Sequence, residues 1–303
     1  MMKVVFILGP TASGKTNVAI NLAKEFGGEI ISCDSIQIYK GLDIGSSKPS
    51  IEEQQGVKHH LLSAVEIGEK YTAGDFRRDA LKILQSSQEK VMWVVGGTGF
   101  YFKALEFGMA NNPKMNDHDR AQLLTEWQSK LLDSFYEELQ KKDSARAAEI
   151  DRNDSYRIFR AIEILRLGYK PSELKTQFKP DAFPFPLLKI GLQVDKMNLR
   201  QNVRARVQGM LDNGFIKEVE RLRTSGFKDW EPMHSVGYKE IGQYLDKEII
   251  EADLVEQITT KTMQLAKRQI TWLKKDTTIH WHDLANITEI KNQVKSFLGV
   301  ENE

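Results

Sequence analysis

The first third of the chain alternates short apolar runs with helical stretches. Continuous apolar runs at residues 3–9, 29–33 and 91–95 have the composition of strands covered on both faces of a parallel sheet. Between them, residues 16–26 and 75–84 carry apolar side chains at helical spacing. Strands that alternate with helices in this way predict βαβ units and a parallel, doubly wound α/β sheet.

After about residue 111 the pattern becomes mainly helical. Segments 116–148 and 157–167 have helical spacing, whereas 170–186 contains four prolines and is expected to be a loop or hinge. A strand is predicted at 187–194, helices are predicted at 198–211, 216–223, 237–245 and 254–274, and a last short strand is predicted at 278–281. We expect a sheet core of residues 1–110 and 186–303 with C-terminal helices, and a helical insertion of residues 111–185.

Composition adds little that is specific. The 303 residues carry a net charge of +1 and a single cysteine, Cys33, so no disulfide can form within the chain. The first apolar run is too short for a signal peptide, and no stretch approaches the ~20 apolar residues of a membrane span. We expect a cytoplasmic monomer without a membrane partner. The near-neutral charge leaves a nucleic-acid partner open, since a local basic face would suffice.

A phosphate-binding loop lies between the first predicted strand and the first predicted helix. It has the pattern G-x-x-x-x-G-K-[ST] and consists of Gly9, Pro10, Thr11, Ala12, Ser13, Gly14, Lys15 and Thr16. The glycines let backbone amides face phosphate oxygens, and the helix N-terminus adds positive potential. Lys15 supplies a cation, and the Thr16 hydroxyl is the expected ligand of Mg²⁺. The core is therefore expected to be of the P-loop NTPase type, with the reaction still open.

The neighbouring strand ends do not match an ATPase or a GTPase. Strand 91–95 ends in Gly96-Gly97-Thr98, where those enzymes place an aspartate that holds Mg²⁺. Asp34 follows the second strand, at the edge where open α/β sheets bind ligands, and this position suits a general base. A cap or an indirect contact with Mg²⁺ is the alternative for Asp34. Thr98 is a candidate hydrogen-bond donor to a leaving oxygen, with a simple turn as the alternative.

Several motifs follow one another along nearly the whole chain. They include Ser32-Cys-Asp-Ser-Ile-Gln-Ile-Tyr39 and occupy residues 9–16, 32–39, 43–49, 59–61, 71–76, 96–101, 153–163, 235–240 and 266–272. Together they resemble the tRNA dimethylallyltransferases (tRNA isopentenyltransferases). The resemblance implies transfer of a dimethylallyl group from dimethylallyl diphosphate to the exocyclic amine of adenosine 37, beside the anticodon of tRNAs that read codons beginning with U. It also implies Mg²⁺ as cofactor.

The resemblance gives three residues catalytic roles. Asp34 is the base, Thr98 bonds the bridging oxygen of the diphosphate, and Arg206 clamps the diphosphate. This agrees with the chemistry, because an allylic diphosphate needs its leaving charge neutralised and an aryl amine needs a base. The family often has Arg-Ile where this chain has Asn202-Val203. Arg204 therefore remains an alternative clamp, and an exposed helix cation is the alternative for Arg206.

Candidate contacts with the tRNA anticodon stem-loop fall into groups. Near the flipped base they are Asp34, Ser35, Ile36, Gln37 and Thr98, and loop capping is the alternative for Ser35 and Gln37. On the insertion they are Arg120, Arg157 and Arg160, and salt bridges to Asp154 and Glu163 are the alternative for Arg157 and Arg160. A basic C-terminal face, either RNA-binding or merely solvated, contains Lys261, Lys267, Arg268, Trp272, Lys274 and Lys275. The histidines are expected to be structural: His59, His60, His280 and His282.

Three other functions remain as alternatives. An adenylate isopentenyltransferase would prenylate free nucleotides and would need no insertion to grip tRNA. A small P-loop kinase would explain the phosphate loop, with the insertion as a lid, but not segment 34–37 or the basic C-terminal half. A non-enzymatic RNA-binding protein would not need Asp34 and Thr98.

Overall fold

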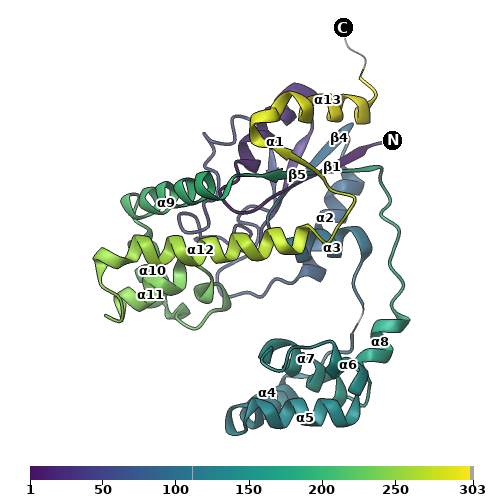
Figure 1. Cartoon of the computed structure of the whole chain (residues 1–303), viewed down its shortest axis with the longest axis vertical. Helices are drawn as coiled ribbons and strands as arrows, with labels where there is room; N and C mark the ends of the chain where they lie inside the picture. Colours follow the sequence, from purple (N-terminus) through teal and green to yellow (C-terminus); the bar gives the residue numbers. More distant parts are fainter. Residues whose placement is uncertain (111, 301–303) are drawn as a thin grey trace. The chain divides into compact units, whose positions relative to one another are not determined.

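The core of the protein is a six-stranded parallel sheet with the order β3-β2-β4-β1-β5-β6 (Figure 1). The structure is a computed structural model and describes residues 1–110 and 112–300. The strands are β1 (Lys3–Leu8), β2 (Glu29–Cys33), β3 (His59–His60), β4 (Val91–Gly96), β5 (Leu187–Gln193) and β6 (His280–Asp283). All neighbours pair in parallel, which confirms the predicted α/β class and places every strand's carboxyl end at one edge.

The central strand β1 explains why continuous apolar runs form this sheet. Val4, Phe6 and Leu8 belong to the core on one face, and Val5 and Ile7 belong to the core on the other. Because both faces are covered, every position needs an apolar side chain, and no period-two alternation is seen.

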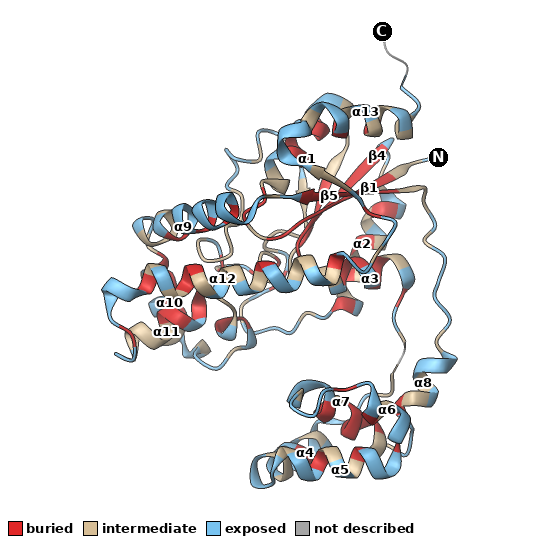
Figure 2. Cartoon of the chain, viewed as in Figure 1, coloured by how far each residue is buried: buried red, intermediate tan, exposed pale blue. Residues whose placement is uncertain are grey.

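Helices cover both faces of the sheet, and their inner sides are buried (Figure 2). On one face lie α1 (Lys15–Phe26) and α13 (Ile287–Leu298). On the other lie α2 (Ala73–Ser86) and α3 (Gly99–Phe107). The loops at the carboxyl ends of β1, β2 and β4 are thus held on a rigid layered scaffold.

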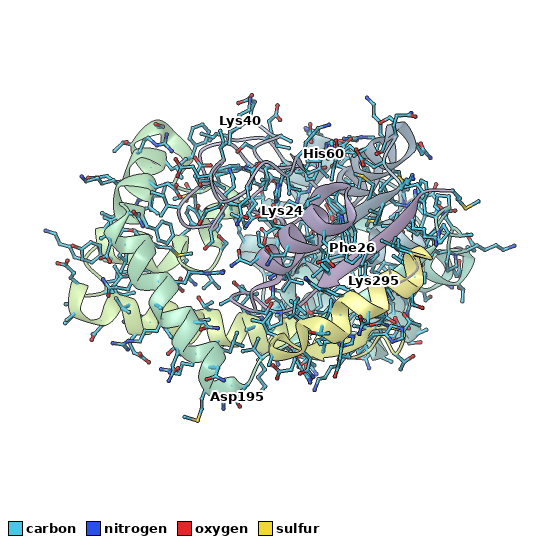
Figure 3. The ribbon with its side chains drawn as sticks, turned by 90° about the horizontal axis from the view of Figure 1, so that it is seen from above. Lys24, Phe26, Lys40, His60, Asp195 and Lys295 are labelled. Atoms are coloured by element: carbon cyan, nitrogen blue, oxygen red, sulfur yellow. The ribbon has the colours of Figure 1, made fainter. Side chains whose placement is uncertain are left out.

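A second apolar core lies among the C-terminal helices. They are α9 (Lys196–Asp212), α10 (Phe215–Leu222), α11 (Tyr238–Leu245) and α12 (Glu251–Leu273), with a π-helical turn at Arg223–Phe227 and 3₁₀ turns at Glu231–His234 and Leu284–Asn286. Ile38, Tyr39 and Leu42, from the segment after β2, are buried in the same cluster. Seen from above, His60 marks the β3 edge, and Asp195, which caps α9, lies on the opposite side (Figure 3).

The segment Phe107–Ala182 forms a second compact unit. Its helices are α4 (Asp117–Ser129), α5 (Leu132–Lys142), α6 (Ser144–Ala148), α7 (Ser155–Arg166) and α8 (Pro171–Gln177). Phe135, Leu139 and Ile162 are buried in a core of its own. The chain divides at 106/107 and 182/183, whereas the expected divisions are 110/111 and 185/186.

The structure differs from the sequence expectations at several elements. Segment 170–186, expected to be a loop or hinge, contains α8, because Pro171 occupies the first turn of the helix, where its missing N–H leaves no bond unmade. The sequence predicts neither α3 nor α13, and β3 is too short to give an apolar run. β6 pairs with β5 and begins at His280, whereas the predicted last strand begins at residue 278.

Candidate active site

The phosphate loop connects β1 to α1 and turns at its glycines. Gly14, the N-cap of α1, has φ 79°, a left-handed conformation that favours glycine. A Cβ on Gly9 would lie 2.8 Å from Ser13 Oγ, so a larger residue would be crowded where the loop leaves the strand. The loop leads directly into the N-terminus of α1, whose free backbone amides favour phosphate oxygens.

Lys15 is the first residue of α1 and folds back over the loop. Its ammonium donates a hydrogen bond to the carbonyl of Pro10 at 2.9 Å. Burial and the nearby guanidinium of Arg206 lower the pKa of Lys15 to about 8, whereas the carboxylate of Asp34 acts in the opposite direction. Cations crowded together at a helix N-terminus form a site suited to a negatively charged ligand.

The two candidate arginines of α9 have different partners. Arg206 Nη1 donates to Thr11 Oγ1 at 3.3 Å, which places this guanidinium at the phosphate loop. Arg204 instead forms an ion pair with Glu256 of α12 at 3.1 Å. The geometry therefore favours Arg206 as the arginine that reaches a bound diphosphate.

Asp34 directly follows β2 and caps the turn after it. Its Oδ1 accepts hydrogen bonds from the backbone N–H groups of Ile36 at 2.9 Å and Gln37 at 3.2 Å. The capping role, one of the alternatives for Asp34, is thus observed. The carboxylate also acts on the phosphate loop, because it raises the pKa of Lys15. Capping and proton transfer are compatible, since both capping bonds use one carboxylate oxygen.

Thr98 joins the end of β4 to the end of β2. Its backbone N–H donates to the carbonyl of Cys33 at 3.4 Å, and its hydroxyl oxygen accepts from the N–H of Ser35 at 3.2 Å. The two strand ends are close, since a Cβ on Gly96 would lie 2.0 Å from Cys33 O. The bond from Ser35 uses a lone pair of the Thr98 oxygen and not its proton. Thr98 is therefore held in place without losing its capacity to donate.

The side chain of Gln37 is bonded within the protein. Its oxygen accepts from Ser32 Oγ at 3.0 Å, and its nitrogen donates to the carbonyls of Ser46 at 3.2 Å and Ser47 at 3.1 Å. The neighbouring Ile36 packs against the C-terminal core. The Gln37 amide therefore has the loop-capping contacts of the alternative role, and its contact with a base edge stays a prediction.

The three arginines expected to meet RNA form ion pairs in the helical unit. Arg157 pairs with Asp154 at 2.9 Å, and Arg120 pairs with the buried Glu163 at 3.0 Å. Arg160 also pairs with Glu163. For Arg157 and Arg160 these are the salt bridges named as the alternative, whereas the pair of Arg120 with Glu163 was not predicted. All three arginine side chains remain partly exposed, so the pairs would have to open or share charge for an RNA phosphate to bind.

One side of α12 borders an open groove of about 450 Å³. The residues that line it are Gln264, Lys267, Arg268, Thr271, Trp272 and Lys275. Three of the predicted basic residues are among them, next to an aromatic ring. Positive charge beside an aromatic side chain is typical of surfaces that bind single-stranded nucleic acid.

Sequence reasoning missed a buried carboxylate that organises a loop near the site. Glu218 of α10 accepts hydrogen bonds from the backbone N–H groups of Asp43, Ile44 and Gly45, and from the hydroxyl of Tyr238. In the sequence, this role of Glu218 is indicated by one feature: an acidic residue lies on the apolar face of a strongly amphipathic helix.

It also missed Gln269 of α12, whose side chain contacts two loops of the site. Its oxygen accepts from the backbone N–H of Thr11, and its nitrogen donates to the carbonyl of Gly97. The only sequence signal is its place within the motif at residues 266–272.

Three of the histidines have the local contacts of structural residues. His59 contacts Val57 O at 2.8 Å, His60 contacts Glu29 at 2.6 Å, and His282 contacts Gln293 at 2.7 Å. His280 is exposed at the edge of the sheet.

A resident metal centre has no support in the described part of the chain, where no three His, Cys, Asp or Glu side chains are grouped to hold an ion. Mg²⁺ usually binds with one or two protein oxygens and with substrate phosphates. The Thr16 hydroxyl, at the start of α1 beside Lys15, is an oxygen ligand of this kind. The residues therefore fit an Mg²⁺ ion that arrives with a diphosphate.

Comparisons with known sequences agree on one family. A family model described as IPP transferase matches residues 37–276. The chain is 45% identical over 303 residues to a tRNA dimethylallyltransferase of Bdellovibrio bacteriovorus, covering 97% of this chain and 98% of the relative. It is 37% identical over 302 residues to a tRNA dimethylallyltransferase of Geobacter sulfurreducens, covering 98% and 97%.

Solved structures show the same likeness. A full-length tRNA isopentenylpyrophosphate transferase from Bacillus halodurans is similar with a TM-score of 0.73 and 31% identity, over 99% of this chain and 97% of that one. A eukaryotic dimethylallyltransferase acting on tRNA is similar with a TM-score of 0.81 and 27% identity, over 98% of this chain and 78% of that one. The likeness thus extends over nearly the whole chain.

Proposed function

The chain belongs to the IPP transferase family, and we propose that it transfers a dimethylallyl group from dimethylallyl diphosphate to the exocyclic amine of adenosine 37 in tRNA. The relatives are tRNA-modifying prenyltransferases, and the chain shares that class of activity. The adenosine beside the anticodon, the allylic diphosphate and Mg²⁺ are the specific parts of the proposal.

One observation carries the proposal: a phosphate loop stands beside a strand-end carboxylate instead of a strand-end metal ligand. Thr98 at the end of β4 lies next to Asp34 and the end of β2, and β4 also pairs with β1, which leads into the loop. A base and a hydroxyl donor at the edge of a diphosphate cradle fit a reaction in which diphosphate leaves and an amine attacks.

The chain's own residues account for both charges that develop in the reaction. As the carbon–oxygen bond of the allylic diphosphate breaks, negative charge grows on the leaving group, where Lys15 and Arg206 neutralise it and the Thr98 hydroxyl donates to the bridging oxygen. As the carbon–nitrogen bond forms, the amine loses a proton to Asp34, whose Oδ2 is the oxygen not used to cap the turn. Mg²⁺, held by Thr16 and the phosphates, supplies further positive charge when bound.

The substrate base has to leave its stack to reach this site. Adenosine 37 belongs to a single-stranded loop, where bases are more easily unstacked than in a duplex. The basic groove of α12 with Lys267, Arg268 and Trp272 offers charge and a stacking surface for the loop. Arg120, Arg157 and Arg160 of the helical unit are the proposed contacts for phosphates of the anticodon stem.

The proposal also covers the setting in which the chain works. Among the described residues, no helix is long and apolar enough to cross a membrane. Cys33 is the only cysteine and is buried. We propose a monomer that acts in the cytoplasm, and light scattering at several concentrations would test its mass.

Transfer of labelled dimethylallyl diphosphate to unmodified tRNA tests the function. Label on adenosine 37, absent from a tRNA that carries guanosine there, supports the proposal. Label on free AMP but not on tRNA would favour an adenylate isopentenyltransferase. A phosphorylated acceptor after incubation with ATP would favour a kinase. The relatives favour the first outcome over both alternatives.

A further inference from the structure

One side chain of α12 joins the two loops that surround the diphosphate site. Gln269 Oε1 accepts from the backbone N–H of Thr11 at 2.9 Å, and Gln269 Nε2 donates to the carbonyl of Gly97 at 3.1 Å. The acceptor and the donor of the amide are thus used on different loops. We propose that Gln269 is a positioning residue that fixes the phosphate loop relative to the Thr98 loop, and thereby sets how tightly diphosphate is held.

The two loops are in contact at their bases, since a Cβ on Gly97 would lie 3.3 Å from the carbonyl oxygen of Gly9. They leave the carboxyl ends of neighbouring strands, β1 and β4, where the hydrogen bonds of the sheet stop at Leu8 and Gly96. Beyond that point, each loop supplies one group of the diphosphate site: the phosphate cradle on one side and the Thr98 hydroxyl on the other. A small change in their separation alters the fit to a charged group held between them.

The loop backbone is shaped to admit the Gln269 side chain. A Cβ on Gly97 would lie 2.5 Å from Gln269 Nε2, so the amide occupies space that only glycine leaves free. One turn further along α12, Trp272 packs on the same loop, since a Cβ on Gly99 would lie 2.2 Å from Trp272 Cε3. α12 therefore contacts the Thr98 loop twice, from side chains three residues apart that share one helix face.

The helix that carries Gln269 is itself firmly anchored. Ala266 is buried in the core of the C-terminal helices, and Leu273 is buried in the core of one sheet face. These two residues flank Gln269 and belong to different cores. α12 is thus a rigid support, and a rigid support is what a positioning side chain requires.

The amide cannot be replaced by a carboxylate of the same shape. In Gln269→Glu one oxygen still accepts from Thr11, but the other faces the carbonyl of Gly97 without a proton to donate. The glutamate side chain also places a negative charge beside a site that binds diphosphate. Gln269→Met keeps the length and helix propensity of the side chain but lacks both hydrogen-bonding groups.

The inference rests on the proposed function and is tested on a partial reaction that needs no tRNA. Binding of inorganic diphosphate with Mg²⁺ is measured by calorimetry for wild type, Gln269→Met and Gln269→Glu. The control is Gln208→Ala on α9, whose exposed amide donates to Asp212 of the same helix. We expect diphosphate to bind ~10-fold more weakly to Gln269→Met, which lies within the range for the two hydrogen bonds that this variant loses. The loss should be larger in Gln269→Glu and absent in the control.

Two further readouts separate positioning from other roles. The affinity for tRNA should stay within about twofold of wild type in Gln269→Met, and kcat for transfer should fall ~10-fold or more, as expected for a misplaced reacting group. Circular dichroism melts identify folded variants. If Gln269→Met does not fold, Gln269→Leu provides the same comparison, because leucine also lacks both hydrogen-bonding groups and adds no charge.

The outcomes distinguish this inference from the proposed function. A folded Gln269 variant that binds diphosphate as wild type does, or that loses only tRNA affinity, would overturn the positioning role. A wild-type protein that binds diphosphate but does not prenylate tRNA would refute the function and leave the positioning role to be judged on diphosphate binding. A wild-type protein that does not bind diphosphate would overturn both.

Discussion

Replacing Asp34 with asparagine separates the two roles of this carboxylate. Oδ1 caps the turn by accepting from Ile36 and Gln37, and the other oxygen is the proposed proton acceptor. Asparagine keeps a carbonyl oxygen for the cap, whereas its amide nitrogen cannot act as a base. Asp34→Asn therefore removes the chemistry and retains the turn, whereas Asp34→Ala removes both.

The expected magnitudes differ between activity and stability. Loss of a general base lowers kcat by ~10²–10⁴-fold, which is about 3–5 kcal/mol in the activation free energy. Two capping hydrogen bonds contribute about 1–3 kcal/mol to the free energy of unfolding at ~0.5–1.5 kcal/mol each. Both variants should thus lose activity to a similar extent, and only Asp34→Ala should also lose stability.

The Michaelis constant provides a second distinction. Asp34 is a negative charge close enough to Lys15 to affect its pKa, so its removal takes an anion away from the diphosphate site. Binding of dimethylallyl diphosphate should therefore not weaken in Asp34→Asn. At pH 6.5, where Lys15 stays protonated, kcat should fall while KM for the diphosphate stays level or decreases.

Single-turnover transfer of labelled substrate to tRNA, together with urea unfolding, measures these quantities. The reasoning fails if Asp34→Asn retains more than about a tenth of wild-type kcat, because a general base contributes more than that. It also fails if the asparagine and alanine variants are destabilised equally, because the cap would then not depend on Oδ1.

Three further outcomes follow from the charges of the site. Protonated Lys15 is the form that pairs with phosphate, and its pKa is about 8. Calorimetry should therefore show an affinity for Mg²⁺-diphosphate that is highest below pH 7 and decreases by ~10-fold per pH unit well above pH 8. Lys15→Arg should remove this pH dependence. In steady-state kinetics, Arg206→Ala should raise KM for dimethylallyl diphosphate ~10-fold or more, whereas Arg204→Ala, which loses only a surface ion pair, should change it less than about twofold. Urea unfolding should show that Glu218→Gln costs about 2 kcal/mol, because an amide cannot accept all four hydrogen bonds, and that Tyr238→Phe costs about 1 kcal/mol.

The parts of the site that lie at strand ends were accessible to sequence reasoning because their positions are set locally. The loop at 9–16 follows a buried strand, and Asp34 follows the next one, so the parallel sheet brings both to the same edge. The order of β2, β4 and β1 then places Thr98 with them. Strand type and chain direction are visible in the apolar pattern, whereas the strand order that places Thr98 between the other two is seen only in the structure.

The parts that sequence reasoning missed depend on contacts between distant segments. Gln269 reaches Thr11 across 258 positions of the chain, and Glu218 reaches the loop at 43–45 across more than 170. No local period or motif spacing encodes such a partner. For Gln37 the sequence likewise does not show its partners: in the structure its amide is bonded to three serines of its own neighbourhood, and its contact with substrate stays a prediction.

The strand order also explains why Thr98 is suited to the bridging oxygen. β4 lies between β2, which ends at Cys33 and is followed by Asp34, and β1, which leads into the phosphate loop. The bond that breaks has carbon on the side of the base and phosphate on the side of the cradle, so its oxygen belongs between the two. In the proposed reaction, a donor after the middle strand would meet that oxygen, while Arg206 of α9, which contacts Thr11 of the phosphate loop, would act on the phosphate side. In this proposal the N-terminal half supplies the cradle with Lys15, the donor and the base, and the C-terminal helices supply Arg206 and, through Gln269, the spacing between the loops.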